Sequence, residues 1–143
     1  MWNYRQVHIK LTAVIVKRKP LSEEAAAKHA ADVALAGQFD DLLGQARGAE
    51  DALRFAQADG APLAELHRLG QRLDGALTAV MRAAFAAERA AIGPRGYDDR
   101  IYRRKAMATA PVRAWTMEAQ RLLTLRESHR LTGIARLPRQ PAV

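Results

Sequence analysis

Apolar residues recur every three or four positions between residues 22 and 92. This spacing places apolar side chains on one face of an α-helix. One series runs through residues 35–56 and a second through 66–91, with the sequence ADGAPL between them. We therefore predict an antiparallel hairpin, made of one continuous helix over 22–58 and a second helix that ends near residue 92. The side chains expected to face inward are Leu35, Phe39, Leu42, Leu53, Leu66, Leu73, Leu77 and Val80.

Residues that begin and end helices stand at the edges of both series. Ser22 is a candidate N-cap, and two glutamates follow it in the expected first turn. Gly60 can adopt the left-handed conformation that ends a helix, and Pro62 suits a first helical turn. Gly93 and Pro94 are expected to stop the second helix.

Five glycines lie inside the predicted helices, where each lowers the helix propensity by up to about 1 kcal/mol relative to alanine. We expect them to serve close packing between helices, because glycine lets two backbones approach each other. These positions are Gly37, Gly44, Gly48, Gly70 and Gly75.

The C-terminal third predicts two further helices. Asp98 or Asp99 is expected to cap a short helix that reaches Ala108. Thr109 is expected to cap a longer helix that ends at Gly133. The side chains expected to face inward from the longer helix are Trp115, Ala119, Leu122 and Leu125.

The first nineteen residues fit two descriptions. Apolar and polar residues alternate in VHIKLTAVIV, residues 7–16, and β-branched residues dominate this stretch, which is typical of a strand. A helical spacing that joins Tyr4, Val7, Leu11 and Val14 also fits the pattern. A strand here would present unpaired backbone groups, so we expect it to pair with a second copy or a neighbouring subunit.

Together these patterns predict a mainly α fold. A long antiparallel helical hairpin is followed by one or two C-terminal helices, with an N-terminal β-strand or extended arm. With 143 residues the chain has about the length of one domain. The segments are a basic N-terminal arm or strand (1–21), the helical hairpin (22–92), the basic C-terminal helices (93–133) and an extended tail (134–143).

Composition narrows the class of protein. The chain has no cysteine, which excludes disulfides, thiolate zinc sites and thiol nucleophiles and fits a reducing compartment. No apolar run is long enough to cross a bilayer, so we expect a cytoplasmic protein. Alanine contributes 30 residues, and arginine outnumbers lysine 18 to 5. Both are also typical of GC-rich genomes, so the arginine preference is weak support for phosphate binding.

The net charge of +8 is concentrated at the two ends of the chain. Residues 1–20 carry five cations and no acid, and residues 95–143 carry eleven cations and four acids. Residues 21–60 carry three cations and eight acids, whereas residues 61–94 are nearly balanced with four cations and three acids. Basic ends of this kind suit a polyanion or an acidic protein surface.

The sequence shows no pattern of a catalytic or cofactor-binding site. The four histidines lie on different predicted elements without the spacing of a metal site. The acid pairs 40–41 and 98–99 are adjacent in sequence, so their carboxylates diverge on a helix, and no phosphate-binding loop is present. We expect no catalytic residue, no metal, no cofactor and no small-molecule substrate.

The segment RIYRRKAM, residues 100–107, is the strongest candidate for a binding site. Helical spacing puts Arg100, Arg103 and Arg104 on one face, and Tyr102 can stack on an unpaired base. The alternatives are a contact with an acidic protein groove, or a solvated helix in which Ile101 and Tyr102 are buried.

The hairpin would bring both basic segments to the same end of the molecule. In an antiparallel pair, residues 22 and 92 meet, so the basic run at 17–19 would lie near the run at 95–105. We call this expected cationic surface the basic pole. Its candidate nucleic-acid-binding residues are Lys17, Arg18, Lys19, Arg95, Arg100, Tyr102, Arg103, Arg104, Lys105 and Arg113.

Three functions fit these patterns. The first is a non-catalytic small basic helical subunit that contacts nucleic acid, RNA or single-stranded DNA more than a specific duplex, within a multi-protein complex. Its other partners would be protein subunits, including copies of itself. The second is a structural adaptor of a phage or secretion assembly that binds acidic protein surfaces. The third is a membrane-surface peptide at the N-terminus, with Trp2 and Tyr4 at the interface.

Overall fold

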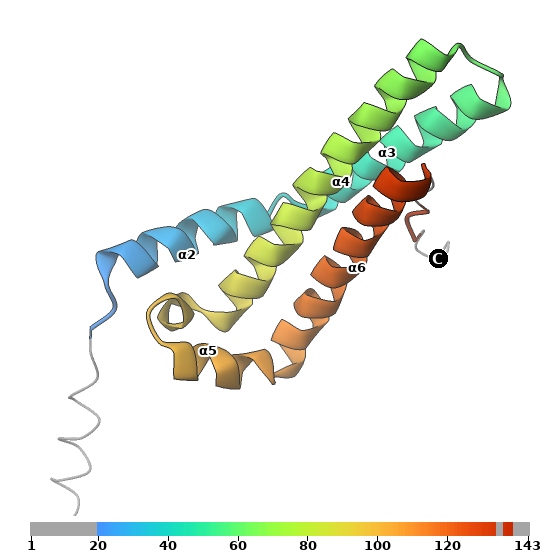
Figure 1. Ribbon diagram of the computed structural model, residues 1–143. Coiled ribbons are helices and arrows are strands. Elements are labelled where there is room, and N and C mark those ends of the chain that lie inside the picture. The colour runs from blue at the N-terminus through green and yellow to red at the C-terminus, as the bar shows by residue number, and fades with distance from the viewer. Residues whose placement is uncertain (1–19, 134–135, 139–143) are drawn as a thin grey trace, which may run out of the picture.

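The structure, a computed structural model, describes residues 20–133 and 136–138. Within these ranges the chain forms five α-helices and one 3-10 helix and has no β-strand, so the prediction of a mainly α fold is confirmed (Figure 1). The expected N-terminal strand lies outside the described residues. The elements are α2 (Glu23–Ala36), α3 (Phe39–Ala58), α4 (Leu63–Ile92), η1 (Pro94–Tyr97), α5 (Arg100–Met107) and α6 (Ala110–Thr132).

Helix α4 is the central element. Its 30 residues span about 45 Å. Helices α3 and α6 run along α4 in the opposite direction, and α2 contacts the C-terminal half of α4 (Figure 1). None of the helices in the described ranges is long and apolar enough to cross a membrane.

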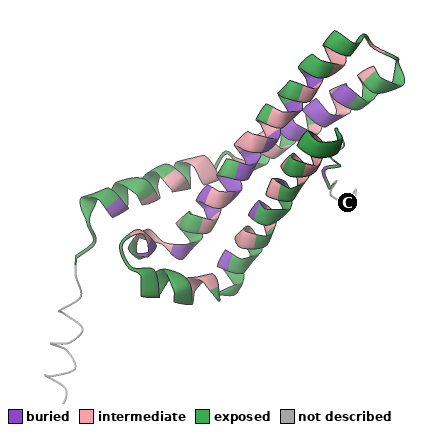
Figure 2. Cartoon of the chain, viewed as in Figure 1, coloured by how far each residue is buried: buried purple, intermediate pink, exposed green. Residues whose placement is uncertain are grey.

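The core lies between α4 and the helices around it (Figure 2). Of the side chains expected to face inward, Leu53, Leu73, Leu77 and Val80 are buried. Three others, Phe39, Leu42 and Leu66, are partly buried against the core, and Leu35 is half-buried.

Helix α6 completes the core, as its apolar spacing predicts. Ala119 and Leu122 are fully buried, and Leu125 packs against them. Trp115 meets Phe39 of α3 edge to face, with ring centroids 5.1 Å apart. Thr109 stands at the N-cap position of α6 but makes no side-chain cap hydrogen bond.

The first predicted helix is not continuous. Helix α2 ends at Ala36, and α3 begins two residues later at Phe39. The amide of Gly37 still donates to the carbonyl of Val33, but the amide of Gln38 donates to Leu35, only three residues back. Glycine is a common site of sharp helix bends. The bend lets α2 and α3 run in different directions while both contact α4 (Figure 1).

The turn between α3 and α4 falls at residues 59–62. Gly60 has a positive φ of 65°. Its amide donates to the carbonyl of Gln57, and the amide of Ala61 donates to Ala56, which is the Schellman pattern of a helix end. Pro62 is the N-cap of α4 and not part of its first turn.

The expectation that the helix glycines serve close packing is wrong for three of the five. A Cβ atom at Gly44, Gly48 or Gly75 would meet nothing within 4 Å. At Gly70 the nearest atom would be Cε1 of His129, 4.0 Å away, and Gly37 faces only its own helix. Gly44, Gly48 and Gly75 therefore do not lie where two helices approach each other closely.

Candidate nucleic-acid interface

The start of α2 lies against the basic C-terminal segment. The hydroxyl of Ser22 accepts a hydrogen bond from the amide of Ala25 at 3.1 Å, which confirms Ser22 as the N-cap. The same hydroxyl donates to the carboxylate of Asp98 at 2.7 Å. The contact joins residues 22 and 98 at one end of the fold.

Three of the predicted site residues, Lys17, Arg18 and Lys19, lie outside the described residues, and the described chain begins at Pro20.

A polar cluster fixes η1 against α2 and α4. Arg89 donates two hydrogen bonds to Asp32, at 2.8 and 2.9 Å, and the Tyr97 hydroxyl donates a third. The hydrogen bonds from Arg89 lower the pKa of Asp32. Burial, and then the hydrogen bond to Asp32, raise the pKa of Tyr97 to about 12. His29 meets the Tyr97 ring edge to face, and its Nε2 lies 3.3 Å from the carbonyl of Ala90.

Gly96 sets the distance between η1 and α4. A Cβ atom at this position would lie only 2.3 Å from Cγ2 of Ile92, so a larger residue would force the two elements apart. The carbonyl of Gly96 accepts a hydrogen bond from Arg103 Nη1 at 3.3 Å. Arg103 therefore fastens α5 to η1, which is a structural contact that helical spacing could not reveal.

Helix α5 begins at the cap that the sequence suggests. Asp99 Oδ1 accepts from the amides of Ile101 and Tyr102, each at 3.0 Å. None of the eight residues of α5 is buried. Ile101 is 70% exposed and Tyr102 is 41% exposed. The burial of Ile101 and Tyr102 that the solvated-helix alternative expected is therefore wrong.

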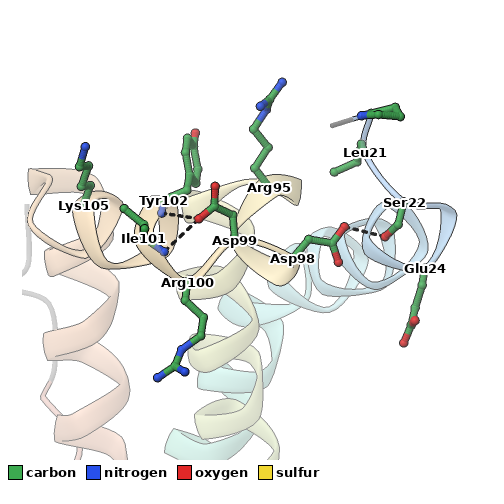
Figure 3. A pocket seen from close by; sticks show the side chains of 11 residues that line it. Leu21, Ser22, Glu24, Arg95, Asp98, Asp99, Arg100, Ile101, Tyr102 and Lys105 are labelled. Carbon is green, nitrogen blue, oxygen red and sulfur yellow. Dashed lines mark hydrogen bonds between the residues drawn. The ribbon is translucent and has the colours of Figure 1, made fainter. Parts of the chain in front are cut away.

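An open groove of about 1070 Å³ runs between the chain before α2 and the η1–α5 segment. Figure 3 shows Arg95, Tyr102 and Lys105 projecting to one side of it, whereas Arg100 points to the other. Leu21 and Ile101 add apolar surface to the lining. Tyr102 therefore lies between two cations, although not beside Arg100.

The lining of this groove is balanced in charge. Three acids, Glu24, Asp98 and Asp99, oppose three cations. Asp98 accepts the Ser22 hydroxyl and Asp99 accepts two α5 amides, so both carboxylates are already engaged.

The cations of the candidate site that the structure describes are Arg95, Arg100, Arg103, Arg104, Lys105 and Arg113. Among the described cations of the site, none forms an ion pair with another described residue. They contrast with Arg89 and Arg130, which pair with Asp32 and Asp74 between helices. Five of these cations are exposed and form neither an ion pair nor a side-chain hydrogen bond with a described residue: Arg95, Arg100, Arg104, Lys105 and Arg113.

Two of the described histidines contact backbone carbonyls of α4. His129 Nε2 lies 2.9 Å from the carbonyl of Gly70, and His29 Nε2 lies 3.3 Å from that of Ala90. His67 is exposed, and His8 lies outside the described residues. No group of three or more potential metal ligands occurs among the residues that the structure places.

Sequence reasoning missed the cluster of Asp32, Arg89 and Tyr97. Its members come from three elements, α2, α4 and η1, with 57 and 65 positions between partners. No local spacing signals such a contact. The cluster matters for the site because it fixes the turn from which α5 projects.

No protein family model matches the chain, and no curated protein or solved structure is found to be similar to it.

Proposed function

We propose that the protein is a non-catalytic, nucleic-acid-contacting subunit of a larger cytoplasmic complex, and that α5 with its flanks is the contact surface. One observation carries the proposal. Helix α5 exposes Arg100, Arg104 and Lys105 without ion pairs, next to an exposed Tyr102, and buries none of its residues. A helix with no share in the core and a high density of unpaired charge is well suited to bind a polyanion.

The chemistry of the surface favours a single strand. Cations that form no ion pairs can replace the counterions of a phosphate backbone. Tyr102 offers an exposed ring between Arg95 and Lys105, and base–aromatic stacking contributes about 1–3 kcal/mol per base. An unpaired base of RNA or single-stranded DNA can reach such a ring, whereas a base in a duplex is already stacked.

The opposite end of the molecule supports contact with other protein subunits. Phe55, near the end of α3, is 72% exposed, and Leu63, the first residue of α4, is 82% exposed. Both stand beside the α3–α4 turn, far from α5 (Figure 1). Exposed apolar side chains of this size favour burial against a partner. The pairing of an N-terminal strand with a neighbouring subunit belongs to the same proposal.

A structural adaptor that binds an acidic protein surface is the second candidate. Leu21 and Ile101 give the groove an apolar part, which a protein partner would bury and a phosphate chain would not use. The two candidates differ in ligand but share the cations of α5.

Fluorescence anisotropy with single-stranded RNA, single-stranded DNA and duplex DNA tests the proposal. The variant Arg104→Glu with Lys105→Glu should bind the single strands at least about tenfold more weakly than the parent. These two positions are better targets than Arg103, because Arg103 holds the Gly96 carbonyl. Arg72→Glu with Arg82→Glu makes the same charge change on the exposed face of α4 and should bind nearly as the parent does.

Two outcomes would reject the proposal. One is equal loss of affinity in both double variants, which would mean that only net charge matters. The other is a parent protein that binds no nucleic acid but binds an acidic polypeptide such as polyglutamate, which would favour the adaptor. Far-ultraviolet circular dichroism of each variant checks that the helices are retained.

A further inference from the structure

The groove beside α5 combines an exposed aromatic ring with carboxylates. Tyr102 is 41% exposed and lies between Arg95 and Lys105, whose cations suit a phosphate backbone. Carboxylates have the opposite effect, because their charge repels phosphate. A surface that contacted phosphates alone would therefore bind them better without acids in its lining. The three acids of the groove need a separate explanation.

Contacts within the chain explain two of these acids. Glu24 Oε1 lies 2.8 Å from Nζ of Lys28 on the same helix. Asp98 Oδ2 accepts the Ser22 hydroxyl on the side of the groove next to α2 (Figure 3). Neither contact involves Tyr102, so neither acid is placed to act together with the exposed ring.

Asp99 is the acid beside Tyr102. As the N-cap of α5, its Oδ1 accepts the amides of Ile101 and Tyr102, each at 3.0 Å. Its Oδ2 forms no hydrogen bond with a described residue, and Figure 3 shows this oxygen on the side to which the Tyr102 ring projects. The cap thus uses one carboxylate oxygen and leaves the other as an acceptor next to the ring.

An unused acceptor beside a stacking surface can distinguish between bases. An amino group on the edge of a stacked base can donate to a carboxylate oxygen, whereas a carbonyl oxygen at the same place cannot. Cytosine has an amino group at C4, where uracil and thymine have an oxygen. A carboxylate is the acceptor that suits the amino group of cytosine.

We propose that Tyr102 and Asp99 form a base-binding site that prefers cytosine to uracil. The Tyr102 ring stacks on the base, and Asp99 Oδ2 accepts a hydrogen bond from the C4 amino group. The neighbouring cations contact the phosphates, which fixes the strand but carries no information about the base. This inference rests on the proposed nucleic-acid contact and adds to it the residue that sets the base preference.

Asp99→Asn is the decisive substitution, because it keeps the helix cap and changes the group beside the ring. Asparagine caps helices about as well as aspartate, so its amide oxygen can accept the same two α5 amides. Its NH₂ group then takes the place of Oδ2 and donates a hydrogen bond instead of accepting one. The C4 oxygen of uracil can accept that bond, so the preference should shift towards uracil.

Fluorescence anisotropy with labelled oligocytidine and oligouridine of equal length measures the preference. The parent should bind oligocytidine at least about threefold more tightly than oligouridine, as expected for one hydrogen bond to a charged group. In Asp99→Asn the ratio of the two affinities should fall at least about threefold below that of the parent. Comparing ratios between variants cancels any difference in structure between the two free strands.

Two further variants serve as controls. Asp98→Asn removes the same charge from the groove and leaves Asp99 in place, so it should raise both affinities and keep their ratio. Tyr102→Leu should weaken the binding of both strands and abolish the preference, because the base no longer stacks beside Asp99. Far-ultraviolet circular dichroism of each variant checks that the helices are retained.

The outcomes separate this inference from the proposed function. Equal affinity of the parent for the two strands, or an unchanged ratio in Asp99→Asn, would overturn the base preference and leave the nucleic-acid contact standing. A parent that binds neither strand would reject the contact and the base preference together.

Discussion

The hydroxyl of Ser22 donates a hydrogen bond to the carboxylate of Asp98, 2.7 Å away and 76 positions later in the chain. Ser22 begins α2, and Asp98 ends η1 just before α5. The contact connects the start of the helical part with the segment that carries the exposed cations. Because the same hydroxyl caps α2, one side chain both starts a helix and fixes it to the candidate interface.

Replacement of Ser22 by alanine should lower the free energy of unfolding by about 1 kcal/mol, because it removes the helix cap and the link to Asp98. Urea unfolding followed by circular dichroism measures the change. Asp98→Ala, which removes the link but keeps the cap, should cost less. Equal stability of Ser22→Ala and the parent would show that neither bond contributes.

Gly96→Ala should destabilise the fold by about 1–3 kcal/mol, because the new methyl group would overlap the buried Ile92. The branched side chain of Ile92 is stiff and cannot easily turn away. Gly75→Ala is the matched control. It adds a methyl group inside α4 with nothing within 4 Å and should stabilise the protein by up to about 1 kcal/mol.

A double variant separates overlap from other effects of the Gly96 substitution. Ile92→Ala removes the atom that the new methyl group would meet, so Gly96→Ala should cost less in that background than in the parent. If the losses of stability of the two single variants simply add in the double variant, as measured by thermal unfolding, the contact between residue 96 and Ile92 is not the cause of the destabilisation.

Asp32 and Tyr97 make the stability of the fold dependent on pH at the acid and the alkaline extreme, respectively. Its pKa is lowered by Arg89, so the ionised carboxylate stabilises the folded state fully above its ordinary pKa, and this contribution is lost as the pH falls below it. The pKa of Tyr97 is raised to about 12 from 10.0. The protonated phenol therefore stabilises the fold fully below pH 10, and that contribution disappears as the pH rises towards 12.

Unfolding free energies measured across pH should show both slopes. Asp32→Asn should flatten the acid side in part, since Asp74 is shifted in the same direction by Arg130 and still contributes. Tyr97→Phe should flatten the alkaline side. Unchanged slopes in both variants would contradict the roles assigned to this cluster.

Features set by neighbouring residues could be predicted from the sequence. Ser22, Asp99 and Gly60 act locally, and all three stand at the helix ends where their chemistry places them. The apolar spacing likewise identified Leu73, Leu77 and Leu122 as core positions. Each of these features depends only on residues within one helix or at its ends. The spacing of apolar and capping residues along the sequence therefore predicts them.

Features set by contacts between distant segments could not be predicted from the sequence. The bend at Gly37 follows from the packing of both α2 and α3 on α4, whereas the heptad spacing runs through it without a break. Arg103 looked equivalent to Arg104, but its bond to Gly96 depends on a 3-10 helix that no pattern indicated. Glu50 accepts a hydrogen bond from the amide of Leu137, 87 positions later, and no local sequence pattern at either residue predicts their contact.

The salt dependence of binding to a single-stranded oligonucleotide tests the central claim most directly. If the α5 cations contact phosphates, the logarithm of the association constant should fall linearly with the logarithm of salt concentration, by about 0.7 for each phosphate contacted. Arg104→Glu with Lys105→Glu should reduce this slope by about 1.4, and Arg72→Glu with Arg82→Glu should leave it unchanged. An affinity that stays constant between about 50 and 200 mM salt, or an undiminished slope in the Arg104–Lys105 variant, would contradict a phosphate contact at α5.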